Sequence, residues 1–539
     1  MNATQQLLDR YQKAKTKRDE SANVLEDIGR FVWPASQDMY NDINQPEGQI
    51  RTQPIYDSTA IMAAQRMASG IFSFLMPIGV QWFQFVAQDA VDKADTNIET
   101  WLSIASQAVQ SEIWRSNFQR EMFTTIRSMT VFGTGCISVE MDSDTKDIVF
   151  RNYHYGDIFY EENQKKVLDV VFRRIRYTVR QAVLEFGLRN VSKQIRGDYD
   201  KGELDNKYEF VHCVFPNDDR KSGKLDDSGK KFKSVYIEVM AKKRVKVKGF
   251  NEMPYLVGRL DIAPNEIIGR CPSFDLLPEI KMLNDMKLTF IEGSENAISP
   301  AMLMWDDSVV GQPVTGPRGI INLRPDAPAP VPWNTGFNAA LSMEAIKEEQ
   351  RIVKDGYFND LFDALEDQRN MTATEADIRQ QSKLVILAPM VNALQRELFD
   401  PLLVRVFNLM VEEKSKQSVP LAPKEFDYDV VYQGRLAVAM ATLQANATET
   451  HLAKIIPLEE IWPVIDNYDL DEAVRRSGLS SGVPGDLLRT VEERDGIRNK
   501  RAQDAEAERQ VQLAETASKA IKNVSGTVEP DSIAGLLSG

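Results

Sequence analysis

A proline-rich segment separates two helical patterns in the middle of the chain, and it restricts the possible folds more than any other feature. Proline fixes its own φ angle and has no amide hydrogen, so a segment this rich in proline cannot continue a helix. We therefore expect extended and turn structure over 299–335, between one helix over 276–298 and a second helix over 336–358. The prolines that carry this argument are Pro313, Pro317, Pro325, Pro328, Pro330 and Pro332.

The rest of the sequence predicts an α+β fold that is mainly helical. Residues 1 to about 130 show helical periodicity, including one helix expected over 97–129. Residues 136–261 instead alternate between apolar and polar types, as the strands of a largely antiparallel sheet do. From about residue 440 the pattern is helical again as far as 523, and 524–539 is typical of a flexible tail.

A helix is expected to begin shortly after the second of the two flanking helices. Thr372 and Glu375 match the pattern of a capping box, in which the threonine hydroxyl accepts an amide hydrogen bond and the glutamate reaches back to the cap. The apolar stripe that follows predicts a long helix within 372–435, which Pro389 and Pro401 should kink. The polar residues 359–371 therefore indicate a loop between two helices.

Composition limits what this chain of 539 residues can do. Its hydrophobic fraction of 43% is that of a folded soluble protein, and its net charge of −14 argues against a protein that coats DNA, because non-specific binding to phosphates depends on Lys and Arg. We expect no signal sequence, and the most apolar window, 69–80, is too short to cross a bilayer. The cysteines have no close spacing, so we expect reduced core residues at Cys136, Cys213 and Cys271.

Residues with catalytic potential are few. No phosphate-binding loop of the G-x-x-x-x-G-K-[ST] type occurs, and the histidines His154, His212 and His451 have no partner at helical spacing. The segment GLSSG formally matches the nucleophile elbow of hydrolases around Ser480, but it lies between two helical patterns rather than between a strand and a helix. We therefore expect no enzyme activity, no cofactor and no metal, with hydrolysis at Ser480 as the alternative.

The helix expected over 336–358 carries a basic face. Lys347, Arg351 and Lys354 are spaced by four and three residues, so they share one side of the helix, and two glutamates, Glu344 and Glu348, lie within pairing distance. Two interpretations remain open. The face is either solvated and neutralised by intrahelical ion pairs, or it forms a basic ring when many copies surround a polyanion.

Several stretches resemble the portal proteins, or head-to-tail connectors, of short-tailed, podovirus-type bacteriophages. These stretches are RMASGIFSFLMPIGVQWFQF, VFGTGCISVE, GRCPSFDLLPEIKMLNDM, NMTATEADIRQQ with LAPMVNALQRELFDPLLVRVFNLM, and GVPGDLLRTVEERDGIRNKRAQ. They are spread over nearly the whole chain, and their order and spacing agree with that family.

The resemblance implies a ring, usually of twelve subunits, at one capsid vertex, with a central DNA channel. The helices over 276–298 and 336–358 would be paired stem helices, and 359–371 would be a channel loop. The other implied regions are a wing (1–275, with its β region 136–261, and the kinked helix 372–435), a clip (299–335), a helical crown with a possible C-terminal barrel (436–523) and the flexible tail (524–539).

The resemblance also implies roles for three groups of residues. The stem cations would line the channel: Lys281, Lys287, Lys347, Arg351 and Lys354. The channel loop would present Asp360, Asp363, Glu366, Asp367, Arg369 and Asn370. The clip would dock partners through Trp305, Asp306, Asp307, Arg318 and Arg324. Twelve copies of the chain would together carry about −168, so DNA would meet a mostly repulsive surface with selected basic rings.

The function implied is a non-enzymatic conduit through which double-stranded DNA is packaged and ejected without sequence specificity. The implied partners are further copies of the chain in a dodecamer, the terminase large subunit, a tail adaptor, and the major capsid and scaffolding proteins. Such a protein is assembled in the host bacterial cytoplasm, is not inserted in a membrane, and ends at the portal vertex of the virion. The alternative is a structural head or scaffold component that oligomerises without conducting DNA.

Overall fold

The computed structural model describes most of the N-terminal four-fifths of the chain and two shorter parts near its end. The described residues are 3–37, 52, 54–77, 79–88, 96–142, 144–221, 224, 226–305, 309–311, 322–334, 336–361, 388–412, 427–433, 451, 469–471, 473–474 and 491–525. They fall into two compact units, residues 1–437 and residues 438–539, and each unit is described by itself.

The first unit begins with helices, which are shorter than the sequence suggests. They are α1 (Ala3–Asp19), α2 (Ala22–Val32), α3 (Thr59–Leu75), α5 (Thr96–Arg115) and α6 (Phe118–Phe132). The expectation of a single helix over 97–129 is wrong, because the helical structure is interrupted at Asn117, between α5 and α6. The Asn117 side chain donates to the carbonyl of Phe150 (2.7 Å) and accepts from its amide (2.9 Å), so it holds a strand instead of continuing the helix.

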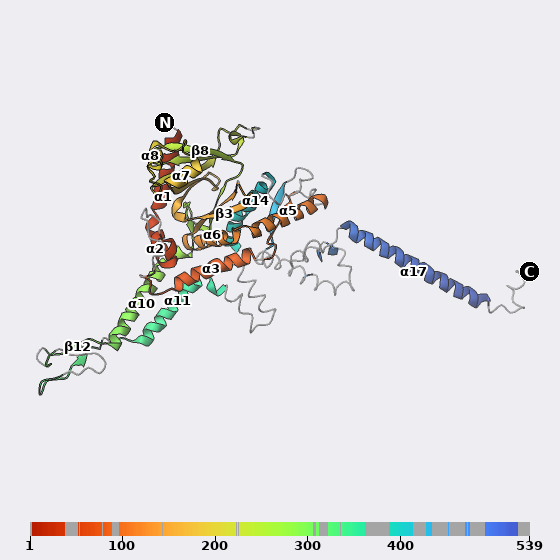
Figure 1. Ribbon diagram of the computed structural model, residues 1–539. Coiled ribbons are helices and arrows are strands. Elements are labelled where there is room, and N and C mark those ends of the chain that lie inside the picture. Colours follow the sequence, from red (N-terminus) through yellow and green to blue (C-terminus); the bar gives the residue numbers. More distant parts are fainter. Residues whose placement is uncertain are drawn as a thin grey trace, which may run out of the picture. The chain divides into compact units, whose positions relative to one another are not determined.

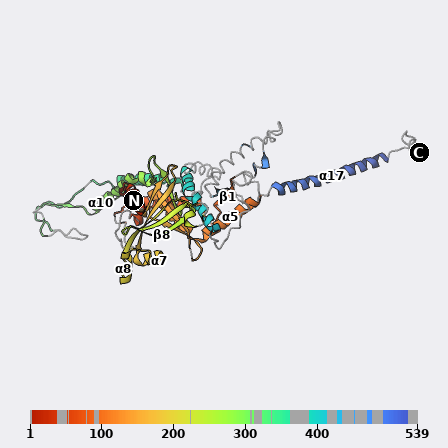
Figure 2. The ribbon, with the colours of Figure 1, turned by 90° about the horizontal axis from the view of Figure 1, so that it is seen from above.

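A five-stranded antiparallel sheet forms one layer of this unit. Its strands, in spatial order, are β4 (Ile158–Glu162), β5 (Leu168–Thr178), β6 (Lys207–Pro216), β7 (Phe232–Glu238) and β8 (Lys243–Phe250). One face packs on α1 through a core that includes Tyr11 and Phe172. The other face packs on α7 (Val179–Phe186) and α8 (Lys193–Lys201), which Figure 2 shows beside β8. Because β8 is the last strand in the spatial order, it is an edge strand.

A three-stranded antiparallel sheet packs against α6. Its order is β3 (Ile148–Tyr153), β2 (Thr134–Met141) and β9 (Tyr255–Arg259). Gly133 ends α6 with φ +75° and so turns the chain from helix into strand. A Cβ at Gly133 would lie 2.1 Å from the carbonyl oxygen of Gly269, so no other residue fits there. Gly269 belongs to a short hairpin formed by β10 (Asp261–Ile262) and β11 (Gly269–Arg270).

Two segments more than 300 residues apart form a further antiparallel pair, β1 (Phe83–Ala87) and β14 (Tyr428–Tyr432). The strand β14 lies in the range 372–435 that was expected to be helical, so this part of the expectation is wrong. Its aromatic residues explain the difference, because Tyr428 meets Phe85 edge-on at 5.4 Å and Tyr432 stacks on Trp82 at 6.3 Å. Pairing with a distant strand overrides the local pattern.

The helix that was expected to be kinked is described from residue 388 to residue 412. It contains a π-helical turn, Gln395–Phe399, followed by α14 (Asp400–Glu412). Pro401 has no amide hydrogen to donate to the carbonyl of Glu397, which accounts for the irregular turn just before it. The helix changes type just before Pro401 and continues through it, so the predicted kink at Pro401 stays a prediction. Thr372 and Glu375 lie outside the described residues.

A pair of helices extends from the first unit. A short helix, α9 (Pro272–Asp275), leads into α10 (Leu277–Ile298), and α11 (Ala339–Gly356) returns beside α10. At the far end of the pair, β12 (Met302–Leu303) and β13 (Val331–Pro332) form an antiparallel ribbon, which an isolated bridge between Val309 and Leu323 extends. The described part of the proline-rich segment is therefore extended, as predicted.

The second unit contains one long helix, α17 (Val491–Ser525). Arg494 and Arg498 of this helix form ion pairs with Asp471 at 3.1 Å and 2.6 Å. Nearly all of its described side chains are exposed. Across both units, none of the described helices has the length and apolar character needed to cross a membrane.

Candidate functional site

The antiparallel helix pair α10 and α11 is the candidate site, and glycines bring its two helices together at both ends. A Cβ on Gly293 of α10 would lie 2.7 Å from the ring of Phe337, and a Cβ on Gly356 of α11 would lie 2.6 Å from Leu276. The Phe337 ring also packs against Phe290 at 5.7 Å. Glycine in a helix costs about 1 kcal/mol relative to alanine, so both glycines are explained by close packing rather than by helix propensity.

The half of the helix pair nearest the body is fixed by hydrogen bonds to the segment before α3. The Asn284 side chain accepts from the amide of Tyr56 (2.7 Å) and donates to the carbonyl of Pro54 (3.2 Å). Gln350 of α11 donates to Asp57 at 2.7 Å. The buried apolar side chains of both helices lie in this half: Leu277, Ile280, Leu283, Ile346 and Val353. This half is therefore rigidly attached to the body.

The far half of the pair and its tip expose large apolar side chains. Ile298 is 84% exposed, Leu341 is 66% exposed and Trp305 is 75% exposed. Leu303, Val310, Val331 and Trp333 of the ribbon are also exposed by more than half. A continuous series of exposed apolar residues on a folded protein marks an interaction surface. The sequence analysis named Trp305 but not Trp333. The position of Trp333 directly after Pro332, in the proline-rich segment, could have indicated it.

The cations of α11 lie together on an exposed side of the helix, as the spacing predicted. Lys347, Arg351 and Lys354 are exposed, whereas Ile346 and Val353 face the body. Arg351 binds Glu348 through two hydrogen bonds of 2.6 Å and 3.1 Å. The hydrogen bond and charge of Arg351 hold the pKa of the Glu348 carboxyl below its ordinary value. Part of the basic face is thus neutralised within the helix, while Lys347 and Lys354 form no ion pair with another described residue.

The two cations of α10 do not form one stripe. Lys281 donates to Asp27 of α2 at 2.5 Å, so it ties the helix pair to the body. Lys287 lies over the ring of Phe290, with its ammonium 5.7 Å from the centroid. Six residues separate them, which places them on different sides of a helix with 3.6 residues per turn. The five candidate cations are therefore a compact set on α11 and two separate positions on α10.

The expected channel loop is described only at its beginning. Residues 359–361 form a helical turn, and Asp360 is exposed there. Burial, together with the charge of Asp360, raises the pKa of Asp355 at the end of α11. Acidic groups therefore gather where α11 ends. The other expected loop residues, Asp363, Glu366, Asp367, Arg369 and Asn370, lie outside the described residues.

The expected docking residues at the tip are described in part. Trp305 and Arg324 are exposed on the ribbon. Asp306, Asp307 and Arg318 lie outside the described residues.

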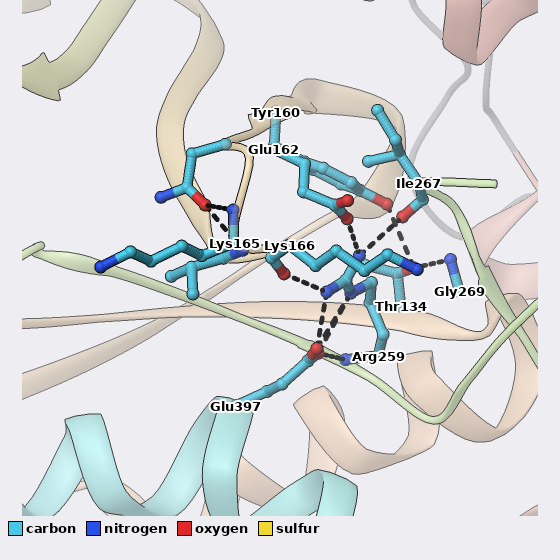
Figure 3. Close-up of polar contacts among 11 residues, drawn as sticks. Thr134, Tyr160, Glu162, Lys165, Lys166, Arg259, Ile267, Gly269 and Glu397 are labelled. Carbon is cyan, nitrogen blue, oxygen red and sulfur yellow. Dashed lines mark hydrogen bonds and ion pairs between the residues drawn. The ribbon is translucent and has the colours of Figure 1, made fainter. Parts of the chain in front are cut away.

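A buried ion network anchors the helix that leads away from the undescribed segment 362–387. Arg259 of β9, which is 1% exposed, binds Glu397 of the π-helical turn and Glu162 of β4 (Figure 3). The shortest distances are 2.6 Å to Glu397 and 2.8 Å to Glu162. Burial alone would lower the pKa of Arg259, but the hydrogen bonds to both glutamates raise it. The network joins the three-stranded and the five-stranded sheet to the helix that contains Glu397. The spacing of these residues in the sequence did not predict it.

Two of the histidines without a partner at helical spacing are engaged in hydrogen bonds within the fold. His212 is fully buried between Tyr255 (2.6 Å) and Ser234 (2.7 Å), and His154 is bonded to the amide of Gly156 and the carbonyl of Ser36. The cysteines are free and buried, as predicted. Within the described ranges, no group of three or more His, Cys, Asp or Glu side chains is placed to hold a metal ion. Ser480 lies outside those ranges.

Comparisons with known proteins agree over nearly the whole chain. The family described as "Bacteriophage head to tail connecting protein" matches residues 4–488. The chain is 25% identical to the "Portal protein" of Salmonella phage epsilon15, over 98% of this chain and 96% of that protein. It is 24% identical to the "Probable portal protein" of Bordetella phage BPP-1, over 95% of this chain and 94% of that protein.

Proposed function

Because this chain belongs to the bacteriophage head-to-tail connecting proteins, we propose that it is the portal of a phage capsid, through which double-stranded DNA enters and leaves the head. Its similarity to two phage portal proteins, each along more than nine-tenths of the chain, supports this function. The family is structural, and a power stroke for DNA movement would come from a separate motor.

The observation that carries the proposal is the antiparallel helix pair, which is rigid at the body and apolar at the far end. A single chain leaves Ile298, Leu341 and the ribbon tryptophans in water. Closed rings bury such surfaces between neighbouring copies, because each copy presents one patch and receives another. A ring of twelve copies follows the pattern of the family, with α10 and α11 as the stem around the channel and the ribbon as the clip.

The charges of the stem suit a channel that DNA passes without binding tightly. Lys347 and Lys354 offer ammonium groups to phosphates, while the Arg351–Glu348 pair and the acidic end of α11 limit the attraction. Repeated phosphate contacts would otherwise increase affinity steeply and stop movement. Because these contacts reach the backbone and not the bases, DNA passes without sequence specificity.

The remaining regions take the roles that the family pattern implies. Residues 1–275, with the kinked helix and β14, form the wing, which meets the major capsid and scaffolding proteins. The ribbon within 299–335 docks the terminase large subunit and later the tail adaptor. Residues 359–371 form the channel loop, and the helices from about 436, including α17, form the crown and a C-terminal barrel. The assembled ring occupies the portal vertex of the virion after assembly in the host cytoplasm.

Electron microscopy of the purified full-length protein tests this function. We expect rings of about twelve subunits with an axial opening wider than the roughly 20 Å of a DNA duplex. A closed assembly without an opening, or a monomer at the concentrations used for assembly, would instead support a non-conducting structural head component. Docking of the ring at a single vertex of isolated heads would distinguish the portal from a component present at every vertex.

A further inference from the structure

The edge strand β8 and the loop that precedes β7 form a strongly basic region within an acidic protein. Residues 217–250 contain eleven Lys and Arg against five Asp and Glu, an excess of six positive charges, whereas the whole chain carries −14. We call this region the basic edge. It lies on the first unit at the end remote from the β12–β13 ribbon (Figure 1).

Most cations of the basic edge have no acidic partner among the described residues. Lys246 pairs with Glu185 at 2.6 Å, and Lys243 donates to the carbonyl of Val191. No ion pair within the described part of the chain involves Lys221, Lys224, Lys230, Lys231, Lys233, Lys242 or Lys248. These lysines leave an uncompensated positive surface.

The nearby carboxylates are largely occupied by the fold itself. Asp226 accepts from the amide and hydroxyl of Ser228, and Asp227 accepts from the amide of Gly249. Glu238 is buried and accepts from the amide of Ser192. Three of the five acidic residues of the region, Asp226, Asp227 and Glu238, therefore hold its loop and strand ends in place.

Lysines on an exposed edge strand also protect a sheet from pairing with other chains. That explanation accounts for Lys246 and Lys248, which alternate along β8. It does not account for Lys221, Lys224 and Lys231, which lie in the preceding loop and at its end. The positive surface thus extends well beyond the backbone edge that needs protection.

We propose that the basic edge binds an extended acidic segment of a partner protein, which adds to β8 as a further strand. Within the described residues β8 pairs with β7 alone, so no strand lies on its other side, and apart from Gly249, whose amide donates to Asp227, this edge can accept a new strand. The apolar side chains Val247 and Met240 are 47% and 70% exposed beside the lysines. A strand that alternates acidic and apolar residues matches this mixture, because main-chain bonds give affinity and alternate side chains give specificity.

The exposed apolar side chains favour a peptide over a nucleic acid. DNA would use the lysines alone, through contacts to phosphates, and would leave Val247, Met240 and the open backbone edge in water. The proposed partner differs from those assigned to the ribbon, because the basic edge lies at the other end of the unit (Figure 1).

The proposal is tested with the full-length protein and a short peptide in which glutamate and valine alternate. A first variant replaces five exposed lysines of the basic edge with glutamine: Lys221, Lys224, Lys231, Lys242 and Lys248. A control variant replaces five exposed lysines elsewhere: Lys13, Lys17, Lys165, Lys500 and Lys519. A control peptide has the same sequence but carries N-methyl groups along one edge, so it keeps its charge and cannot pair as a strand.

We expect the peptide to bind the unmodified protein and the control variant, and to bind the basic-edge variant at least about tenfold more weakly. Hydrogen exchange of the β8 amides should slow in the complex, and the N-methylated peptide should bind about tenfold more weakly. Equal binding of the two peptides would overturn strand addition. Tighter binding of a short DNA duplex than of the peptide would assign the region to nucleic acid, and binding of neither would leave edge protection as its role.

Discussion

Arg259 and Glu397 come from segments 138 residues apart, yet the carboxylate of Glu397 accepts three kinds of hydrogen bond from Arg259. The Nη2, Nε and backbone amide of Arg259 lie 2.6 Å, 3.1 Å and 2.9 Å from the Glu397 oxygens. The pair attaches the π-helical turn to the strand β9, and therefore fixes the helix that the undescribed segment 362–387 enters.

Glu397→Ala should destabilise the first unit by about 3 kcal/mol or more, because it leaves the buried Arg259 charge with Glu162 as its remaining carboxylate partner. Thermal unfolding followed by circular dichroism measures the change. Glu161→Ala is the matched control. Glu161 is the neighbour of Glu162 on β4 and forms a partly exposed ion pair with Arg10, so its loss should cost less than about 1 kcal/mol. Similar losses for both variants would contradict the role given to Arg259.

Gly293→Ala should lower the stability of the helix pair even though alanine favours helices. The new methyl group would meet the Phe337 ring at 2.7 Å, and overpacking of this kind costs about 1–3 kcal/mol. Gly197→Ala in α8 is the control, because nothing lies within 4 Å of its Cβ and the substitution should stabilise by about 0.5–1 kcal/mol. Denaturant unfolding compares them, and a stabilising Gly293→Ala would show that the helices are not closely packed there.

Arg351→Glu should impair DNA packaging or genome retention while leaving ring formation intact. The substitution places two carboxylates three residues apart on an exposed helix face, which costs only about 0.5 kcal/mol of stability. Counting filled heads and imaging rings separates the two effects. Arg120→Glu is the control, as Arg120 is 87% exposed on α6 and lies beside Glu121. A normal yield of filled heads from Arg351→Glu would remove the channel role of this face.

Replacement of 299–335 by a short glycine and serine linker should abolish binding of the motor and the tail adaptor without unfolding the body. The contacts of Gly293 with Phe337 and of Gln350 with Asp57 lie outside the deleted segment, so the helix pair keeps its own packing. Pull-down with the terminase large subunit measures docking, and the melting temperature measures folding. Motor binding that survives the deletion would place the docking surface elsewhere.

The local rules of the sequence predicted the elements that depend on local chemistry. Proline density predicted the extended ribbon, and helical spacing predicted that the cations of α11 share one side of the helix. The interruption at Asn117 is marked in the sequence by an asparagine between two helical patterns. Its cause is the pair of hydrogen bonds between the Asn117 side chain and the backbone of Phe150. Knowledge of that strand was needed to place the break.

The features that sequence reasoning missed are those that need a partner far along the chain. β14 is a strand because β1 offers an edge and aromatic contacts, and Arg259 is tolerated in the core because Glu162 and Glu397 converge on it. Neither set of residues has a fixed spacing. The basic edge was visible as a local excess of Lys and Arg, but its placement on an open strand edge required the sheet order.

The buried histidine should make the first unit sensitive to acid. Burial, followed by the charges of Arg173, Lys246 and Lys248, lowers the pKa of His212 well below its ordinary value of 6.5. The unfolded chain then binds a proton that the folded chain does not. Stability is therefore fully present above about pH 6.5, and it falls by up to about 1.4 kcal/mol for each pH unit below that value, until the folded protein also takes up the proton.

His212→Gln should flatten this dependence, because glutamine can bond to Tyr255 and Ser234 but does not titrate. The variant also loses the stacking of the imidazole on Tyr236 at 3.8 Å, so it should be less stable at pH 8 and yet lose less on acidification. Ser234→Ala is the control, since it removes one hydrogen bond, worth about 1 kcal/mol, and leaves the histidine to titrate. Melting temperatures at pH 8 and pH 5 compare the three proteins. Parallel losses in His212→Gln and the unmodified protein would mean that other groups govern the acid response.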